Sequence, residues 1–209
     1  MQNNYNPVAG YYDLLIQLIF GKTEVNAQVD MVPFVFPGNR VLIVGGGTGW
    51  ILEKLAAVYP SGLEITYVEP SGRMMSRARK RNWGRNAVTF VERPVEEFVG
   101  EGRYDCILTG FLFDNFYQEH AAAVVTSLDG LLRDGGYWLF TDYYYPRRGG
   151  AWWHGLLLRS MYWAARWICR VEANELPDMK MIFSTAGYRV IFSKFYYRGF
   201  IQSLVYRKG

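Results

Sequence analysis

Residues 41–50 read VLIVGGGTGW, in which four aliphatic residues run directly into four glycines and one threonine. A helical pattern follows from Ile51 to about Tyr59. The combination predicts a buried strand, a tight glycine turn and a helix start, which together let backbone approach a nucleotide closely. A dinucleotide-binding fingerprint, G-x-G-x-x-G/A, requires a small residue where Trp50 stands. The glycines follow G-x-G-x-G instead.

The next predicted strand supports this interpretation. Residues 63–70 read LEITYVEP, and Glu69 follows Gly49 by twenty residues. An acid at the tip of the second strand, at about this spacing, is placed to accept hydrogen bonds from both ribose hydroxyls of a nucleotide. The alternative is an ordinary strand–helix unit with a glycine turn and a surface glutamate.

Length and composition favour one globular domain. The chain has 209 residues, of which 50% are hydrophobic and 17% aromatic, and its formal charge is +4. That mild excess is compatible with an anionic substrate, a membrane surface or nucleic acid. Cys106 and Cys169 show no metal or CxxC spacing, so we expect free thiols in a reducing compartment and no metal site. We find neither a signal peptide nor an uninterrupted apolar span, and we expect a cytoplasmic protein.

Strand and helix patterns alternate along most of the chain, which predicts an α/β fold with a parallel, doubly wound sheet. The predicted strands are 40–44, 63–68, 87–92, 104–110, 136–142, 188–197 and 200–207, the last two forming a hairpin. The predicted helices are 8–20, 23–32, 49–59, 71–82, 116–132, an aromatic-rich helix within 150–170, and 177–186.

Over nearly its full length the chain resembles the class I S-adenosylmethionine-dependent methyltransferases. The resemblance rests on VLIVGGGTG, YVEPSGRMMSRAR, YDCILTGFLFDNF and LLRDGGYWLFTDYY. Two further segments, VAGYYDLLIQLIFG and LPDMKMIFSTAGYRV, resemble small-molecule members such as the quinone-biosynthesis enzymes. The resemblance implies a Rossmann-like seven-stranded sheet, mostly parallel with an antiparallel C-terminal hairpin strand. It also implies a single domain over 1–209, with N-terminal helices at 8–35 and the aromatic-rich insertion at 145–172 as a lid.

The same resemblance implies S-adenosylmethionine as cofactor and a set of residues that bind it. Glu69 holds the ribose, Tyr11 approaches the methionine carboxylate, and Ser71 with Met74 or Met75 lies near the adenine. The full implied set is Tyr11, Gly45, Gly46, Gly47, Gly49, Glu69, Ser71, Met74, Glu96 and Thr109. The chain departs from the family pattern in two places. Ile43 stands where the family has an acid, and Pro94 stands where an acid contacts adenine, so Glu96 is a candidate to replace the latter.

Methyl transfer is an in-line displacement that needs good positioning, and it needs a base only when the acceptor carries a proton. Candidates lie after the fourth and fifth strands, where the crevice of an open α/β sheet opens. They are Asp114, Asn115, Asp142 and, at the start of the inserted helix, His154. We take Asp142 and His154 as the catalytic candidates. Alternatively, Asp142 caps a loop and His154 packs beside two tryptophans.

The aromatic density between Tyr137 and Trp167 bears on the substrate. Facing the crevice, these rings would form an apolar lid for a small hydrophobic or aromatic acceptor, whereas facing outward they would seat the protein peripherally on a membrane. Simple packing on the sheet is the third possibility. The basic run Arg73–Arg85 matches no nucleic-acid-binding motif, so we do not expect a nucleic acid substrate. The rival function is a non-catalytic Rossmann-like protein that binds the cofactor or a membrane. The oligomeric state stays open.

Overall fold

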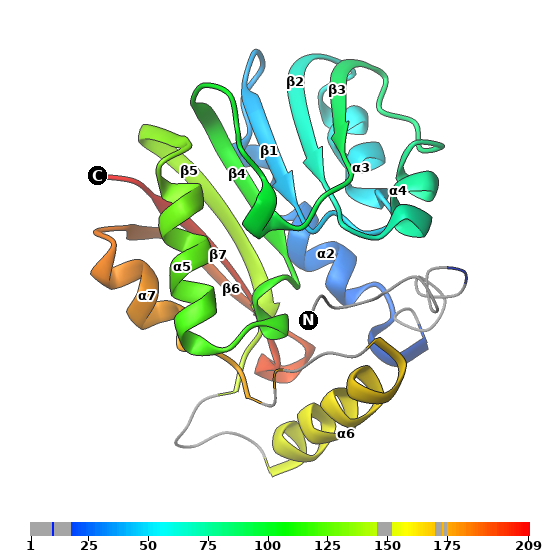
Figure 1. Cartoon of the computed structure of the whole chain (residues 1–209), viewed down its shortest axis with the longest axis vertical. Coiled ribbons are helices and arrows are strands. Elements are labelled where there is room, and N and C mark those ends of the chain that lie inside the picture. Colours follow the sequence, from blue (N-terminus) through cyan, green and yellow to red (C-terminus); the bar gives the residue numbers. More distant parts are fainter. Residues whose placement is uncertain (1–9, 11–17, 146–151, 170–172, 174) are drawn as a thin grey trace.

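The structure is a computed structural model that describes residues 10, 18–145, 152–169, 173 and 175–209. Its centre is one seven-stranded sheet in the order β3-β2-β1-β4-β5-β7-β6 (Figure 1). Strand β7 runs antiparallel to both of its neighbours, while the pairs among β1–β5 are parallel. The predicted Rossmann-like sheet with an antiparallel C-terminal hairpin strand is therefore confirmed. The strands are β1 (Arg40–Val44), β2 (Ser61–Val68), β3 (Arg85–Val91), β4 (Tyr104–Gly110), β5 (Leu132–Tyr143), β6 (Arg189–Tyr196) and β7 (Ile201–Arg207).

Helices cover the sheet on both faces and at its carboxyl end. The described α-helices are α2 (Thr23–Val29), α3 (Trp50–Val58), α4 (Gly72–Ala78), α5 (Gln118–Asp129), α6 (Trp152–Cys169) and α7 (Met179–Thr185). Short 3-10 turns lie at η1 (Val32–Phe34), η2 (Val95–Glu97), η3 (Phe113–Asn115) and η4 (Tyr197–Gly199). The predicted helix 8–20 lies largely outside the described residues.

Several boundaries differ from those predicted. Strand β2 begins at Ser61 instead of at 63, because Ser61 pairs with Arg85 and the amide of Arg85 donates to the carbonyl of Pro60 at 2.7 Å. Helix α4 ends at Ala78 rather than 82, and α2 ends at Val29, followed by a separate turn that contains Pro33. Strand β5 begins at Leu132, which pairs with Tyr104, instead of at 136.

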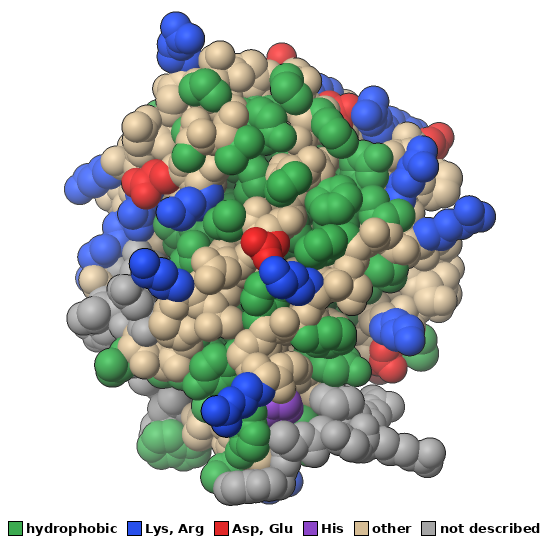
Figure 2. Space-filling view, turned by 180° about the vertical axis from the view of Figure 1, so that it is seen from behind, with side chains coloured by type: hydrophobic (Ala, Val, Ile, Leu, Met, Phe, Trp, Pro, Cys, Tyr) green, Lys and Arg blue, Asp and Glu red, His purple; other side chains and the backbone are tan. Residues whose placement is uncertain are grey.

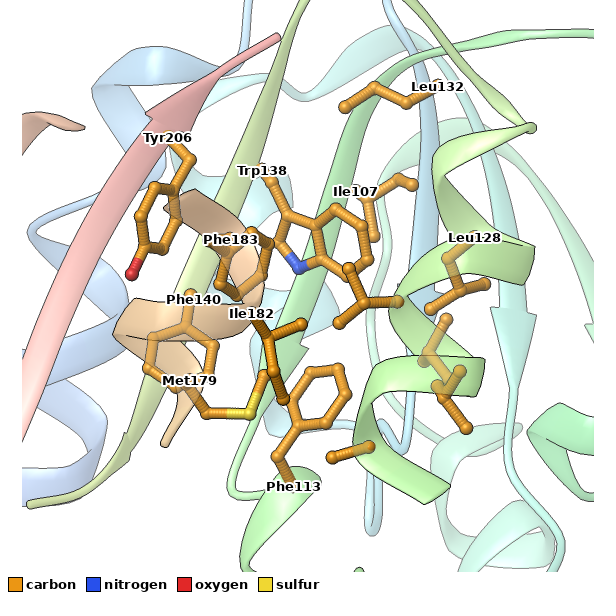
Figure 3. Packing of buried hydrophobic residues seen from close by; sticks show 14 of the residues in the cluster. Ile107, Phe113, Leu128, Leu132, Trp138, Phe140, Met179, Ile182, Phe183 and Tyr206 are labelled. Atoms are coloured by element: carbon orange, nitrogen blue, oxygen red, sulfur yellow. The ribbon is translucent and has the colours of Figure 1, made fainter. Parts of the chain in front are cut away.

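The two faces of the sheet carry separate apolar cores, as the period of a strand requires. Leu42 and Val44 point into the core under α5 and α7, whereas Val41 and Ile43 point into the core under α3 and α4. The first core is rich in aromatic rings (Figure 3). In it Trp138 is fully buried and packs edge-on against Phe183, with ring centroids 5.0 Å apart.

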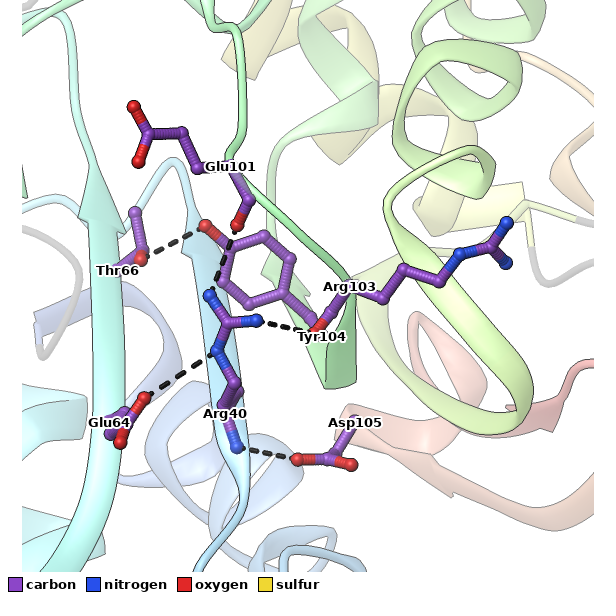
Figure 4. A network of polar contacts seen from close by, with 7 residues as sticks. All are labelled: Arg40, Glu64, Thr66, Glu101, Arg103, Tyr104 and Asp105. Carbon is purple, nitrogen blue, oxygen red and sulfur yellow. Dashed lines mark hydrogen bonds and ion pairs between the residues drawn. The ribbon is translucent and has the colours of Figure 1, made fainter.

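Polar contacts tie the amino ends of the central strands together (Figure 4). The amide of Arg40 donates to Asp105 at 2.7 Å, and its guanidinium donates to the carbonyls of Glu101 and Arg103, both at 3.1 Å. Arg40 also pairs with Glu64 at 3.5 Å. These bonds fix the register of β1 against β4, and so determine where the glycine turn after β1 is presented.

Helix α6 lies beyond the carboxyl ends of the strands (Figure 1). Its residues Leu157, Leu158 and Met161 pack on a third apolar cluster that includes Phe20 and Phe200. The helix therefore covers the edge of the sheet at which an open α/β fold places its crevice.

The glycine turn after β1 packs tightly against α4, and this packing gives a first prediction. Gly49 has φ +80°, and a Cβ there would lie 2.6 Å from the Cα of Ala78. We expect Gly49→Ala to destabilise the fold by about 2–3 kcal/mol, because backbone strain adds to a clash with helix backbone. Gly38→Ala is the matched control, since Gly38 has φ +83° but no atom within 4 Å of the added Cβ. It should cost only about 1 kcal/mol.

The free energy of unfolding in urea, compared between these two variants, measures the effect of the clash. Equal losses in the two variants would contradict the tight approach of α3 and α4.

Candidate functional site

One pocket opens at the carboxyl ends of the central strands, beside the glycine turn. We call it the glycine-loop pocket. Its walls come from the turn after β1, the segments that follow β2, β3 and β4, the end of β5, and helix α2. Its lining residues include Glu24, Gln28, Gly45, Gly46, Gly47, Thr48, Glu69, Met74, Val95, Glu96, Gly110, Phe111, Leu112, Asp114, Phe116, Tyr117, His120 and Tyr143.

The glycines of the turn are there for different reasons. Gly45 and Gly47 have φ of +67° and +61°, a left-handed conformation that disfavours side chains. Gly46 lies where a Cβ would be 2.2 Å from the ring of Tyr67, whose hydroxyl donates to the carbonyl of Gly47 at 3.0 Å. The side chain of Tyr67 thus supports the turn by packing against Gly46 and bonding to Gly47.

Glu69 joins this turn to the start of α4. Its Oε2 accepts the amide of Gly47 and its Oε1 accepts the amide of Ser71, both at 2.9 Å. The side chain is 4% exposed, and burial raises its pKa while the two amide bonds lower it. Each carboxylate oxygen has further acceptor capacity, so Glu69 can hold the loop and accept ribose hydroxyls together.

The pocket fits S-adenosylmethionine by the chemistry of its walls. A Cβ at Gly47 would meet only the sulfur of Met74, at 3.9 Å, so the cavity reaches the backbone of the turn. The described lining carries four acids (Glu24, Glu69, Glu96 and Asp114) and no lysine or arginine. The cofactor bears an ammonium and a sulfonium against one carboxylate, so its net positive charge matches this lining.

The structure brings most of the predicted cofactor residues to the pocket. Gly45, Gly46, Gly47, Glu69, Met74 and Glu96 all line it. Ser71 lies just behind as the cap of α4, its hydroxyl accepting the amide of Met74 at 3.3 Å. Tyr11 lies outside the described residues. All of these remain predicted contacts with the cofactor.

Like Ser71, two further predicted cofactor residues do not line the pocket. Thr109 is 1% exposed and its hydroxyl accepts the indole N–H of Trp138 at 2.9 Å, because the strand period turns it into the core under α5. Gly49 lies at the packed end of the turn, against Ala78. Both residues therefore support the walls of the pocket through packing and do not face its cavity.

The predicted catalytic residues also lie elsewhere. His154 is 4% exposed and packs against Trp153 and Phe200, with centroids 4.0 and 5.3 Å away, and burial lowers its pKa. Asp142 is 3% exposed, and its carboxylate accepts the amides of Phe113 and Asp114 at 3.0 and 3.3 Å. Neither lines the glycine-loop pocket. Loop capping and aromatic packing, the alternatives weighed for these two residues, describe their contacts.

Two pocket residues, Glu24 and Gln28, are absent from the residues predicted from sequence. Both belong to α2, are 6% and 7% exposed, and lie one helical turn apart on its buried face. The hydroxyl of Tyr143 donates to Glu24 at 2.7 Å. In the sequence, the signal that could have marked them is the spacing of Glu24 and Gln28 at i and i+4, on the same helical face as the apolar Ala27.

Three carboxyls lie close enough to interact at this end of the pocket. Burial raises the pKa of Glu24 to about 7, and the nearby Asp142 adds to the rise. Burial also raises the pKa of Asp114, with further increases from the charges of Asp142 and Glu24. The pKa of Asp142 rises to about 7 through burial, against the three amide bonds that it accepts. This end of the pocket favours a positively charged or proton-donating ligand.

The other end of the pocket is built by the segment after β3 and the start of α5. His120 Nε2 lies 3.0 Å from Glu96 Oε1, and the imidazole packs against Phe116 at a tilt, with ring centroids 4.6 Å apart. Pro94, Val95 and Glu96 all line this part of the cavity. The region therefore offers apolar surface and one polar pair.

The basic run after β2 is largely used within the protein. Arg81 donates to the carbonyl of Thr48 at 3.0 Å, Arg77 to that of Gly10 at 2.7 Å, and Arg79 lies over the ring of Phe90. On the face shown in Figure 2, lysine and arginine side chains stand apart between hydrophobic patches.

The sequence also led to expectations about membrane spans, metal ligands, thiols and cellular location. Within the described ranges, no helix is both long and apolar enough to cross a bilayer. Among those same residues, no group of histidine, cysteine and acidic side chains could hold a metal ion. Cys106 is a buried free thiol. The peripheral membrane contact and the cytoplasmic location stay predictions.

Comparison with known proteins agrees with this geometry. Residues 42–138 match the family model of the methyltransferase domain. A curated relative, the ubiquinone/menaquinone biosynthesis C-methyltransferase UbiE of Pseudomonas putida, is 26% identical over 149 residues. The match covers 68% of this chain and 57% of the relative, so it spans little more than half of that protein's length.

Solved structures share the fold. One is a complex between the Haloferax volcanii Trm112 methyltransferase activator and the protein described with it as a methyltransferase. Its TM-score is 0.73, at 14% identity, with 99% of this chain and 98% of that chain covered. Another is the Burkholderia thailandensis 1,6-didemethyltoxoflavin-N1-methyltransferase, which holds its acceptor and S-adenosylhomocysteine. Its TM-score is 0.66, at 19% identity, with 96% and 84% covered.

Proposed function

We propose that this protein is an S-adenosylmethionine-dependent methyltransferase that methylates a small hydrophobic or aromatic acceptor, since residues 42–138 match the methyltransferase-domain model. The observation that carries the proposal is that one cavity joins the glycine turn and Glu69 to an aromatic wall. When bound, the cofactor supplies an electrophilic methyl group on a sulfonium. The protein's task is to align it with the acceptor and exclude water.

The order of the strands gives the cofactor a direction in the pocket. With the ribose at Glu69, after β2, the adenine extends toward Val95 and Glu96, after β3. The methionine end then extends the other way, across β1 toward Gly110 at the end of β4. The methyl group is thereby directed to the side where β4 and β5 end.

The acceptor side of this proposal rests on apolar side chains. Phe111, Leu112, Phe116 and Tyr143 line the pocket near the ends of β4 and β5. An apolar, aromatic wall with few polar groups is typical of sites for small organic molecules. The Burkholderia neighbour binds 1,6-didemethyltoxoflavin, which supports a small molecule as acceptor.

We also propose that the 145–172 segment acts as a lid. The hydroxyl of Tyr162 in α6 donates to the carbonyl of Asp114 at 3.1 Å, directly beside the pocket. Closing a lid excludes water from the transfer step. If the acceptor carries a proton, Asp114, which lines the pocket, takes it in its ionised carboxylate form and becomes the neutral acid, and Asp142 holds the Asp114 loop in position.

Calorimetry with S-adenosylmethionine, followed by transfer of labelled methyl to a panel of phenols and heteroaromatic amines, tests the proposal. We expect cofactor binding in the micromolar range, which is about −8 kcal/mol, and label in at least one small aromatic compound. A protein that shows no binding at millimolar cofactor is not this enzyme. One that binds the cofactor but labels only RNA or protein has a different acceptor class.

A further inference from the structure

The part of the glycine-loop pocket near the end of β4, where we place the methionine moiety, contains polar side chains as well as the apolar Phe111 and Leu112. Glu24 and Gln28 reach it from α2, and Asp114 reaches it from η3. The described lining contains no lysine or arginine that could neutralise the two acids. Glu24 accepts one hydrogen bond, from Tyr143, through one of its two oxygens.

Gln28 independently points to a ligand. It is 7% exposed and lines the pocket, although it belongs to a helix that precedes the glycine turn in the sequence. The side chain is held against Gly110, where a Cβ would lie 2.6 Å from Gln28 Cδ. A carboxamide in this position can offer its oxygen as an acceptor to a ligand in the pocket.

The strand itself supplies no charge on this side. Ile43 is fully buried in the core under α3, and Val44 is the β1 residue that lines the pocket. Any acidic recognition of a ligand near the end of β1 must therefore come from another element. Helix α2 is the element that brings a carboxylate and a carboxamide there, one helical turn apart.

We propose that Glu24 and Gln28 together bind the primary ammonium group of the methionine moiety of S-adenosylmethionine. The inference rests on the cofactor orientation in the proposed function, which directs the methionine toward Gly110. An ammonium offers three N–H donors, and a carboxylate oxygen with a carboxamide oxygen offers two acceptors. The charge-assisted bond to Glu24 is the stronger of the two.

Calorimetry with three probes on the wild-type protein and on Glu24→Gln tests this assignment. The probes are S-adenosylmethionine, S-adenosylhomocysteine, which lacks the sulfonium, and 5′-methylthioadenosine, which lacks the amino-acid group. We expect Glu24→Gln to weaken the first two alike, by about 10- to 100-fold, since a charge-assisted bond is lost. Binding of 5′-methylthioadenosine should change less than about twofold. Glu64→Gln, an exposed acid at the far end of the sheet, is the control and should change none of the three.

Other results overturn the assignment in distinct ways. Equal weakening of all three probes means that the variant disturbs the pocket as a whole, which melting temperatures would check. Weakening confined to S-adenosylmethionine assigns Glu24 to the sulfonium, and no change with any probe leaves Glu24 without a role in cofactor binding. A wild-type protein that binds no probe refutes the proposed function itself.

Discussion

Replacement of Glu69 by alanine is expected to weaken S-adenosylmethionine binding by about 100-fold or more, the largest effect of any single change in the pocket. The variant loses the acceptor that we propose for both ribose hydroxyls. It also releases the amides of Gly47 and Ser71, which Glu69 fixes at 2.9 Å each. A hydrogen bond to a charged group contributes about 1.5–3 kcal/mol, so two such bonds account for this loss.

Calorimetry measures the effect, with Glu64→Ala as the matched control. Glu64 lies on the same strand β2 but is exposed near its amino end, where it pairs with Arg40. Its removal should leave the affinity within about twofold of the wild type, because surface ion pairs contribute little. If both variants bind the cofactor as the wild type does, Glu69 serves the loop alone and the ribose lies elsewhere.

Glu24→Gln is expected to stabilise the cofactor-free protein at pH 8, although it weakens cofactor binding. Burial raises the pKa of Glu24 to about 7 in the native state, against about 4.3 in an unfolded chain. Between these values the native state holds a proton that the unfolded state has lost, so wild-type stability falls as the pH rises from about 4.3 to 7. Glutamine cannot ionise, and the variant avoids this loss.

The gain should be near zero at pH 4 and reach up to about 3 kcal/mol at pH 8, or roughly 5–10 °C in melting temperature. Thermal unfolding of both proteins across this range measures it. Tyr143, Asp142 and Asp114 face Glu24 and are present in both proteins, so the difference between the two curves reports Glu24 together with its coupling to these neighbouring acids.

Asp30→Asn is a control for which we expect the opposite change in melting temperature at pH 8. Lys194 and Tyr196 hydrogen-bond to Asp30 and hold its pKa below the usual range. Its stabilising contribution is present above the unfolded pKa and is lost as the pH falls, so this variant should melt lower at pH 8. If Glu24→Gln also melts lower at pH 8, the carboxylate is stabilised in the native state and the burial argument is wrong.

Together the two Glu24 experiments separate function from folding. A role in ligand binding is one reason for a protein to carry a buried acid that lowers its stability at neutral pH. Loss of ammonium recognition together with a gain in stability is the combined result that our assignment requires.

Local features let the sequence predict the fold and part of the lining of the glycine-loop pocket. The glycine turn depends on backbone conformations that few residues other than glycine adopt, and the spacing to Glu69 follows from one strand–helix–strand unit. Strands 40–44 and 104–110 carry continuous apolar runs, and both were predicted with the bounds that the structure has. These signals are read within about thirty residues of one another.

The acceptor side depends on contacts between distant segments. Asp142 and Asp114 are 28 residues apart, and Tyr143 contacts Glu24 across 119 residues. The residues next to Asp142 in the sequence do not determine whether its side chain faces the pocket or caps the η3 loop. The packing of β4 beside β5 determines this, because it places the η3 loop against Asp142.

The sequence by itself determined the sheet, the glycine turn and the acid that serves it, because backbone conformation and strand period are local properties of the chain. Only the tertiary structure decided which side chains line the pocket. The docking of α2 brought in Glu24 and Gln28, while Thr109 and His154 were turned into apolar cores. The physical reason is that packing between elements far apart in the sequence determines which side of each element faces the pocket.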